Sequence, residues 1–398
     1  MKQLWYRGCH WLCVRIYFQR VTVLHPERLP KGGPALYVGL HRNGAVDGFV
    51  YHQVVPRGIF LVSTQLLQGF FARLFFCGIA VARKQDEKDQ SQNDDALRQC
   101  TQRLADGGEL IVFPEGTSSL GPRHLPFKSG AVRIALDALA RGIPLRLVPL
   151  GIHYERAWAF RSKVEVVVGE TLSTDLPAGL SELGRLKEMK RRMTTALESV
   201  GANFASAEAQ RNAERFAYTA TLGTPRIYFS SLKSLEAGVP EPLLARLREL
   251  EAQPDSRRVL RHQGVPLFPI GPWLLYALLL LGLGPIVLAG AVVNFPPLLA
   301  GWLAARKFAD GPNVVALWRI LIGLPVLVIW AGFLMIVLLV CGAWWWVLGY
   351  ALLTLVALGS LYRAKKLAVA VWNGLVHRPL AREAHEFHQA VLQTLPAA

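Results

Sequence analysis

Two long stretches of this chain contain no charged residue, and they restrict its architecture more than any other feature. The first runs from Val265 to Ala305, and the second runs from Ile320 to Leu361. A helix needs about 20 apolar residues to cross the hydrocarbon core of a bilayer. Each stretch can therefore hold two short crossings, or one long helix and a re-entrant piece. We expect residues 265–362 to form a hydrophobic membrane region.

The prolines and the flanking charges suggest how this region is arranged. Pro285 and the Asn294–Pro297 cluster should break any single long helix over the first stretch. Arg306 and Lys307 follow the first stretch, and a basic tail (residues 363–398) follows the second. Because basic loops stay in the cytoplasm, we favour hairpins whose ends all lie on that side. An odd number of crossings, which would place the Arg306 loop outside, is the alternative.

The chain is strongly basic, with 44 Lys and Arg against 28 Asp and Glu and a formal net charge of +16. Beside apolar spans, such a charge favours membrane lipids as partners over nucleic acid. We find no RNA-binding aromatic motif and no zinc-ligand spacing, so we expect no nucleic acid and no metal. Residues 1–20 alternate basic and aromatic side chains, which is typical of an amphipathic helix in the membrane interface. An ordinary helix packed on the domain explains this pattern equally well.

Residues 21–170 alternate strand and helix signals, which predicts an α/β domain with a mixed, largely parallel sheet. Apolar, β-branched runs predict strands at Ala35–Gly39, Ile59–Ser63, Leu110–Phe113, Leu145–Leu150 and Val164–Val168. The intervening helical signals lie at Asp94–Asp106 and Ser129–Arg141. Beyond this domain, residues 171–264 predict a helical extension, and residues 363–398 predict a cytoplasmic tail.

The segment HRNGAVD supplies a histidine and a carboxylate, His41 and Asp47, directly after the first of these strands. Within one regular helix the two side chains would lie about 240° apart, at 100° per residue. They can meet only if His41 lies in the loop and Asp47 in the following turn or helix, and Gly44 allows that connection. A carboxylate on one ring nitrogen fixes the tautomer, so the other nitrogen can take a proton from a substrate hydroxyl.

Three further segments follow in order: GIAVAR (Gly78 to Arg83), FPEGTS (Phe113 to Ser118) and LVPLGI (Leu147 to Ile152). Together with HRNGAVD, they resemble the four blocks of the glycerolipid acyltransferase family, over less than half of the chain. The resemblance implies an acyltransferase fold for the α/β domain, with His41 as general base oriented by Asp47. It also implies acceptor binding by Asn43, Arg83, Glu115, Gly116, Thr117 and Lys128.

The motifs depart from the family pattern in two places. Five residues separate His41 from Asp47, where the family usually has four, and this spacing resembles yeast-type glycerol-3-phosphate acyltransferases. Ser118 stands where the family has an arginine that binds phosphate. Arg123 or Lys128 can supply the missing positive charge.

The expected protein is therefore a membrane-bound O-acyltransferase of phospholipid biosynthesis, with its catalytic domain on the cytoplasmic face. It would move a fatty acyl group from acyl-CoA or acyl carrier protein to lysophosphatidate, without a metal or other cofactor. Glycerol-3-phosphate or another lysophospholipid is an alternative acceptor. A catalytically silent lipid-binding membrane protein that kept the fold is the alternative from another functional class.

Overall fold

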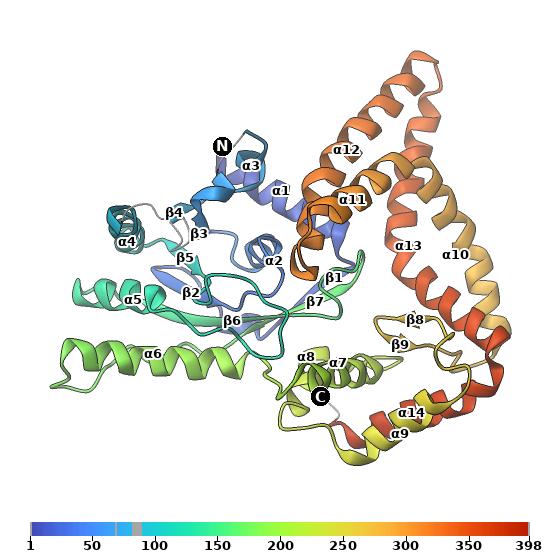
Figure 1. The fold of residues 1–398 in the computed structure, drawn as a ribbon. Helices are drawn as coiled ribbons and strands as arrows, with labels where there is room; N and C mark the ends of the chain where they lie inside the picture. The colour runs from blue at the N-terminus through green and yellow to red at the C-terminus, as the bar shows by residue number, and fades with distance from the viewer. Residues whose placement is uncertain (1, 68–69, 82–89, 397–398) are drawn as a thin grey trace. The chain divides into compact units, whose positions relative to one another are not determined.

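The computed structural model describes residues 2–67, 70–81 and 90–396 (Figure 1). Arg83, an expected acceptor-binding residue, lies outside these described residues. The chain divides into two compact units, which we describe separately. The first consists of Met1–Ala157, Val164–Asn203 and Pro312–Leu317. The second consists of Trp158–Lys163, Phe204–Gly311 and Trp318–Ala398.

The first unit is built on a seven-stranded sheet with the order β1-β7-β6-β2-β5-β3-β4 among the described residues. β2 pairs in parallel with β5 and β6, β3 pairs in parallel with β5 and β4, and β6 and β7 are antiparallel. This is the mixed, largely parallel sheet that the sequence predicted. The strands are β1 (Arg20–Leu24), β2 (Ala35–Gly39), β3 (Gly58–Ser63), β4 (Ile79–Val81), β5 (Glu109–Val112), β6 (Arg146–Tyr154) and β7 (Lys163–Val168).

The five predicted strands correspond to β2, β3, β5, β6 and β7. Every residue of β2 and β5 is buried, because parallel strands at the centre of such a sheet are covered on both faces. Figure 1 shows α2 on one side of the sheet and α5 and α6 on the other. The helices of this unit are α1 (Lys2–Tyr17), α2 (Val46–Val54), α3 (Phe70–Phe75), α4 (Gln90–Ala105), α5 (Gly130–Ala140) and α6 (Glu182–Ser199).

Helix α1 has two different faces. His10, Cys13 and Val14 are buried, and the helix packs against α2. His10 Nδ1 lies 2.8 Å from Nδ1 of His52 on α2, and its Nε2 donates to the Phe75 carbonyl oxygen at 2.7 Å. The other face exposes aromatic and aliphatic side chains, namely Leu4, Trp5, Trp11 and Leu12. One face of α1 therefore belongs to the core, while the other is apolar and open.

The second unit contains a polar helical part and a set of apolar helices. The polar part consists of α7 (Ala207–Ala220), α8 (Tyr228–Ser234), α9 (Glu241–Ala252), the hairpin β8 (Arg261–His262) and β9 (Val265–Pro266), and α14 (Ala381–Thr394). The apolar helices are α10 (Trp273–Val293), α11 (Phe295–Phe308), α12 (Pro312–Val340) and α13 (Trp344–Val376). Fully buried Asn373 joins the two parts, since its Nδ2 donates to the carbonyl oxygens of Leu260 and Leu267 at 2.8 and 2.9 Å.

Three helices of the described chain, α10, α12 and α13, are long and apolar enough to cross a membrane, which indicates membrane association. α11 has 14 residues and is about 21 Å long at 1.5 Å per residue, so it is shorter than a crossing. α10 and α13 are antiparallel, because Trp273 contacts Val371 while Asn294 contacts Thr354.

The proline cluster and Pro285 behave differently from each other. α10 ends at Val293 and α11 begins at Phe295, so the predicted break at the Asn294–Pro297 cluster is confirmed. The predicted break at Pro285 is wrong, because α10 continues through this residue. Apolar helices of the membrane type tolerate an internal proline, since neighbouring groups satisfy the carbonyl that it leaves unbonded.

Candidate active site

The sheet brings the HRNGAVD and FPEGTS segments together. β2 leads into the first segment and β5 into the second, and these two strands are parallel neighbours with Val38 opposite Val112. The carboxyl ends of parallel neighbours meet at the same edge of a sheet, where α/β proteins place their sites. Two backbone hydrogen bonds hold the loops in place. Ser119 N donates to the His41 carbonyl oxygen at 3.1 Å, and Lys128 N donates to the Pro114 carbonyl oxygen at 2.8 Å.

His41 and Asp47 meet in the way that the sequence predicted. His41 lies in the loop after β2, and Asp47 lies in the first turn of α2. His41 Nδ1 is 2.9 Å from Asp47 Oδ2. The loop between them turns at Gly44, whose φ of +54° is in the left-handed region. The five intervening residues therefore do not prevent the pairing.

The Asp47 carboxylate is fully buried and accepts four hydrogen bonds. Besides His41, its Oδ2 receives the backbone N–H groups of Arg42 at 2.6 Å and Asn43 at 2.7 Å. Its Oδ1 receives the hydroxyl of Tyr154, on β6, at 2.5 Å. Burial, and then the nearby charge of Asp47, raise the pKa of Tyr154 well above its usual value, so this hydroxyl remains a donor. These donors and the helix N-terminus hold a buried negative charge in one orientation.

The other side of the His41 ring is available for chemistry. Because Asp47 accepts from Nδ1, the ring proton is on Nδ1 and the lone pair is on Nε2. None of the described residues makes a hydrogen bond to Nε2. The ring stacks on Phe113, with centroids 4.4 Å apart and planes 9° apart, and 8% of His41 is exposed. A fixed neutral imidazole with one open nitrogen is a suitable general base.

Glu115 is buried and ties two loops together. Its Oε1 accepts from His41 N at 2.9 Å, and its Oε2 accepts from Leu125 N at 3.0 Å. Burial raises the pKa of this carboxyl group, while the two backbone donors lower it. Both oxygens are thus engaged within the protein, and Glu115 holds the loop that carries His41 through the His41 backbone N–H. Its contact with an acceptor stays a prediction.

Gly116 and Lys128 lie against each other at the turn of FPEGTS. Gly116 has a φ of +71°, and a Cβ added there would lie 2.5 Å from Lys128 Nζ. The ammonium group is therefore packed onto this turn, and the Lys128 side chain is exposed to solvent. Thr117, the next residue, is also exposed. This arrangement places a cation beside the segment in which Ser118 replaces the arginine of the family pattern.

Asn43 occupies a different kind of position. It is fully buried, and its Nδ2 donates to the carbonyl oxygen of Ala157 at 2.9 Å. The side chain thus supports the HRNGAVD loop from inside. Within the described residues, no three His, Cys, Asp or Glu side chains gather in a way that could hold a metal ion.

Two contributions to the site were not anticipated from the sequence. The first is Tyr154, whose hydroxyl donates to Asp47. The only sequence signal for it was that the apolar strand pattern of LVPLGI continues to this residue. The other is Asn313, in the first turn of α12, which belongs to the first unit. Its Nδ2 donates to Ser118 Oγ at 2.8 Å and to the Ser118 carbonyl oxygen at 3.3 Å. The Asn313 backbone carbonyl oxygen would lie 3.0 Å from a Cβ added at Gly44. This turn of α12 therefore contacts both the HRNGAVD loop and the FPEGTS loop.

Comparisons with known proteins agree with this arrangement. Residues 20–153 match the family model described as Acyltransferase. The chain is 30% identical over 144 residues to a 1-acyl-sn-glycerol-3-phosphate acyltransferase of Chlamydomonas reinhardtii, which covers 35% of this chain and 42% of that relative. It is 29% identical over 121 residues to glycerol-3-phosphate O-acyltransferase 2 of Saccharomyces cerevisiae, which covers 29% of this chain and 16% of that relative. The chain thus spans less than half the length of these two relatives.

Among solved structures, a 1-acyl-sn-glycerophosphate acyltransferase from Thermotoga maritima is similar, with 22% identity and a TM-score of 0.34 over 50% of this chain and 81% of that chain. The region that the family model matches, residues 20–153, carries both loops of the site and most of the sheet. These residues form an acyltransferase domain. The family model and the relatives named above support the glycerolipid acyltransferase assignment that the four sequence blocks indicated.

Proposed function

We propose that the chain is a membrane-bound 1-acylglycerol-3-phosphate O-acyltransferase, which transfers a fatty acyl group from a thioester to the free hydroxyl of lysophosphatidate. The observation that carries this proposal is the His41–Asp47 pair, at 2.9 Å, with His41 Nε2 open beside the FPEGTS turn. The relative from Chlamydomonas reinhardtii, named for this reaction, supports it.

The reaction needs only groups that this domain supplies. The acceptor oxygen attacks the thioester carbonyl carbon while its proton passes to His41 Nε2, and Asp47 stabilises the resulting imidazolium. The tetrahedral intermediate then collapses with cleavage of the carbon–sulfur bond. The proton moves from His41 to the leaving thiolate of coenzyme A or acyl carrier protein. The products are an ester and a free thiol, so the step requires no metal or redox cofactor.

The phosphate of the acceptor would be held near the FPEGTS turn. Lys128 lies on this turn, and its exposed ammonium can reach a ligand there. Arg83 and Thr117 are the further candidates from the sequence. Asn43 and Glu115 would act mainly by holding the loops, because Asn43 Nδ2 and both Glu115 carboxylate oxygens bond to the protein backbone.

The amphiphilic acceptor suggests a location at the membrane surface. The open face of α1 carries Trp5 and Trp11, which are 56% and 53% exposed, and such side chains favour the interfacial zone. Together with the apolar helices, this face would keep the catalytic domain beside its lipid substrate. The basic tail after residue 363 favours the cytoplasmic side for this domain.

Glycerol-3-phosphate is the second candidate acceptor. The five-residue spacing between His41 and Asp47 and the similarity to the yeast enzyme named for that acceptor both favour it. A silent lipid-binding protein is the remaining alternative, and the intact pair and the buried Glu115 argue against it.

The test is acyl transfer by the purified full-length chain in nanodiscs. One labelled acyl-CoA, and separately an acyl carrier protein thioester, is offered with lysophosphatidate, glycerol-3-phosphate or other lysophospholipids. His41→Ala should abolish transfer, and His25→Ala, an exposed histidine outside the site, should retain it. Transfer to glycerol-3-phosphate alone would select the second acceptor. Transfer to no acceptor, or transfer that survives in His41→Ala, would refute the proposed mechanism.

A further inference from the structure

A cavity of about 390 Å³ lies wholly within the second unit and shares no residue with the His41 site. It lies among α7, α10, α13, α14 and the segment that follows β8. Ligand pockets for small molecules commonly have volumes of about 300 to 1,000 Å³. The cavity is therefore large enough for a lipid headgroup and the beginning of a chain.

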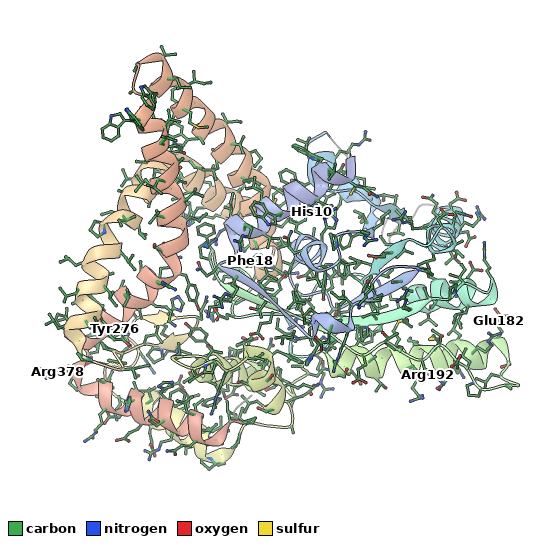
Figure 2. All side chains as sticks on the ribbon, turned by 180° about the vertical axis from the view of Figure 1, so that it is seen from behind. His10, Phe18, Glu182, Arg192, Tyr276 and Arg378 are labelled. Carbon is green, nitrogen blue, oxygen red and sulfur yellow. The ribbon has the colours of Figure 1, made fainter. Side chains whose placement is uncertain are left out.

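One wall of the cavity is apolar and belongs to the helices of the membrane region. Tyr276, Leu279 and Leu283 lie one or two turns apart on α10, so they share a face of this helix. Figure 2 labels Tyr276 on α10. Leu367 and Ala370 of α13 complete this wall. Since α10 and α13 are among the helices suited to a bilayer, the wall is continuous with a lipid-facing surface.

The polar lining is basic. Arg363 and Lys366 lie one turn apart on α13, and His385 and His388 lie one turn apart on α14. No lining residue in the described part of the chain is acidic. Arg363 forms no ion pair with any described residue. Two cations with no lining carboxylate make this a site for an anion.

His388 provides an independent sign of a missing ligand. It is only 8% exposed, and its Nε2 is buried without a hydrogen-bond partner among the described residues. Burial lowers the pKa of this ring, while a hydrogen bond to the Leu222 carbonyl oxygen raises it and the nearby His385 lowers it. Nε2 is thus a buried polar atom that the described protein leaves unsatisfied. A ligand hydroxyl group would satisfy it.

We propose that this cavity is a second lipid site, which binds a lipid with a phosphate headgroup. Arg363 and Lys366 hold the phosphate, and His388 Nε2 accepts a hydroxyl from the glycerol or from the phosphate. The acyl chain follows Leu279 and Leu283 toward the exposed apolar surface of α10. The site goes beyond the proposed acyl transfer, since none of these residues takes part in that chemistry.

The test locates the bound lipid rather than measuring turnover. The full-length chain in nanodiscs is irradiated with a photoactivatable lysophosphatidate, and the crosslinked peptides are identified by mass spectrometry. The proposal predicts crosslinks in residues 273–283 or 381–388, in addition to any in the acyltransferase domain. Crosslinks confined to residues 20–157 would overturn it, whether or not the protein is an acyltransferase.

Variants and competitors test the recognised chemistry. Arg363→Gln combined with Lys366→Gln should reduce crosslinking at these peptides at least tenfold, and His388→Phe should reduce it severalfold. Arg378→Gln, an exposed cation of the same unit outside the cavity lining, is the matched control and should have no effect. If only unlabelled lysophosphatidate reduces the crosslinking, the bound lipid is an intermediate of the pathway. If phosphatidylglycerol also reduces it, the bound lipid is a bulk anionic lipid of the membrane. Equal competition by phosphatidylcholine, or full crosslinking of the double variant, would refute a phosphate-specific site.

Discussion

Replacing Asp47 by Asn separates the charge of this side chain from its shape. The amide oxygen can take the place of Oδ2 and accept from Arg42 N and Asn43 N, now 2.6 and 2.7 Å away. The amide nitrogen can take the place of Oδ1 and donate to the Tyr154 oxygen. The turn is thereby retained, while the negative charge 2.9 Å from His41 Nδ1 is lost.

The expected cost follows from the proton transfer. When His41 becomes an imidazolium, its Nδ1 faces the oxygen of a neutral amide instead of a carboxylate, so the positive charge on the ring is less stabilised. The corresponding change in a serine-hydrolase triad, where the tautomer is also wrong, lowers kcat about 10⁴-fold, or about 5.5 kcal/mol, so this value is an upper limit for Asp47→Asn. We expect a loss of about 10³- to 10⁴-fold in kcat, with a KM for the acceptor within about threefold of wild type.

The assay is steady-state transfer from labelled acyl-CoA to lysophosphatidate in nanodiscs, with thermal unfolding to verify the fold. Tyr154→Phe serves as a graded control, since it removes one donor to Asp47 and leaves the charge, and it should cost about 3- to 30-fold. A well-folded Asp47→Asn variant with kcat within tenfold of wild type would refute the role of the charge. Activity equal to that of His41→Ala would mean that the two residues act as one unit.

Three further predictions concern the surroundings of the site. Gly116→Ala should reduce kcat/KM at least tenfold, because its Cβ would collide with the Lys128 side chain. Gly107→Ala, at a similar φ of +73° but with open space around it, should leave kcat/KM unchanged, and an equal loss in both variants would point to backbone strain alone. Asn313→Ala should raise the KM for the acceptor about 2- to 10-fold, because it removes one hydrogen bond that holds Ser118. An unaltered KM would mean that this contact contributes to stability only. Burial lowers the pKa of His10 to about 4, so the stability due to its neutral ring is present above about pH 6.5 and is lost as the pH falls toward 4. The rate of hydrogen exchange in α1 should rise over that interval, and a rate that does not change with pH would contradict this prediction.

The parts of the fold that the sequence predicted are those with a local signal. The strand at Ala35–Gly39 is a fully buried run between turns, and its observed bounds coincide with the predicted ones. The His41–Asp47 pairing was also predictable, because both residues lie in one short loop-to-helix connection. The wrong prediction of a break at Pro285 also came from a local rule. That rule holds for helices of soluble proteins and does not apply to an apolar helix of the membrane type.

The missed contributions depend on long-range packing. Tyr154 reaches Asp47 because β6 lies beside β2, and the two residues are 107 positions apart. Asn313 reaches Ser118 across 195 positions, through a helix whose composition indicates only membrane insertion. Neither contact leaves a periodicity or a motif in the sequence. Predicting them would require the strand order and the path of α12, which a single sequence does not encode locally.

These long-range contacts also bear on what the catalytic unit is. The family match ends at residue 153, one residue before Tyr154, and Asn313 lies far beyond that end in the sequence. Yet both residues bond to the two loops that the chemistry would use. A fragment limited to the matched region would therefore contain His41, Asp47 and Glu115 but lack the Tyr154 donor to the carboxylate and the support of Ser118. The first turn of α12 thus belongs to the acyltransferase site, although α12 as a whole has the composition of a membrane anchor.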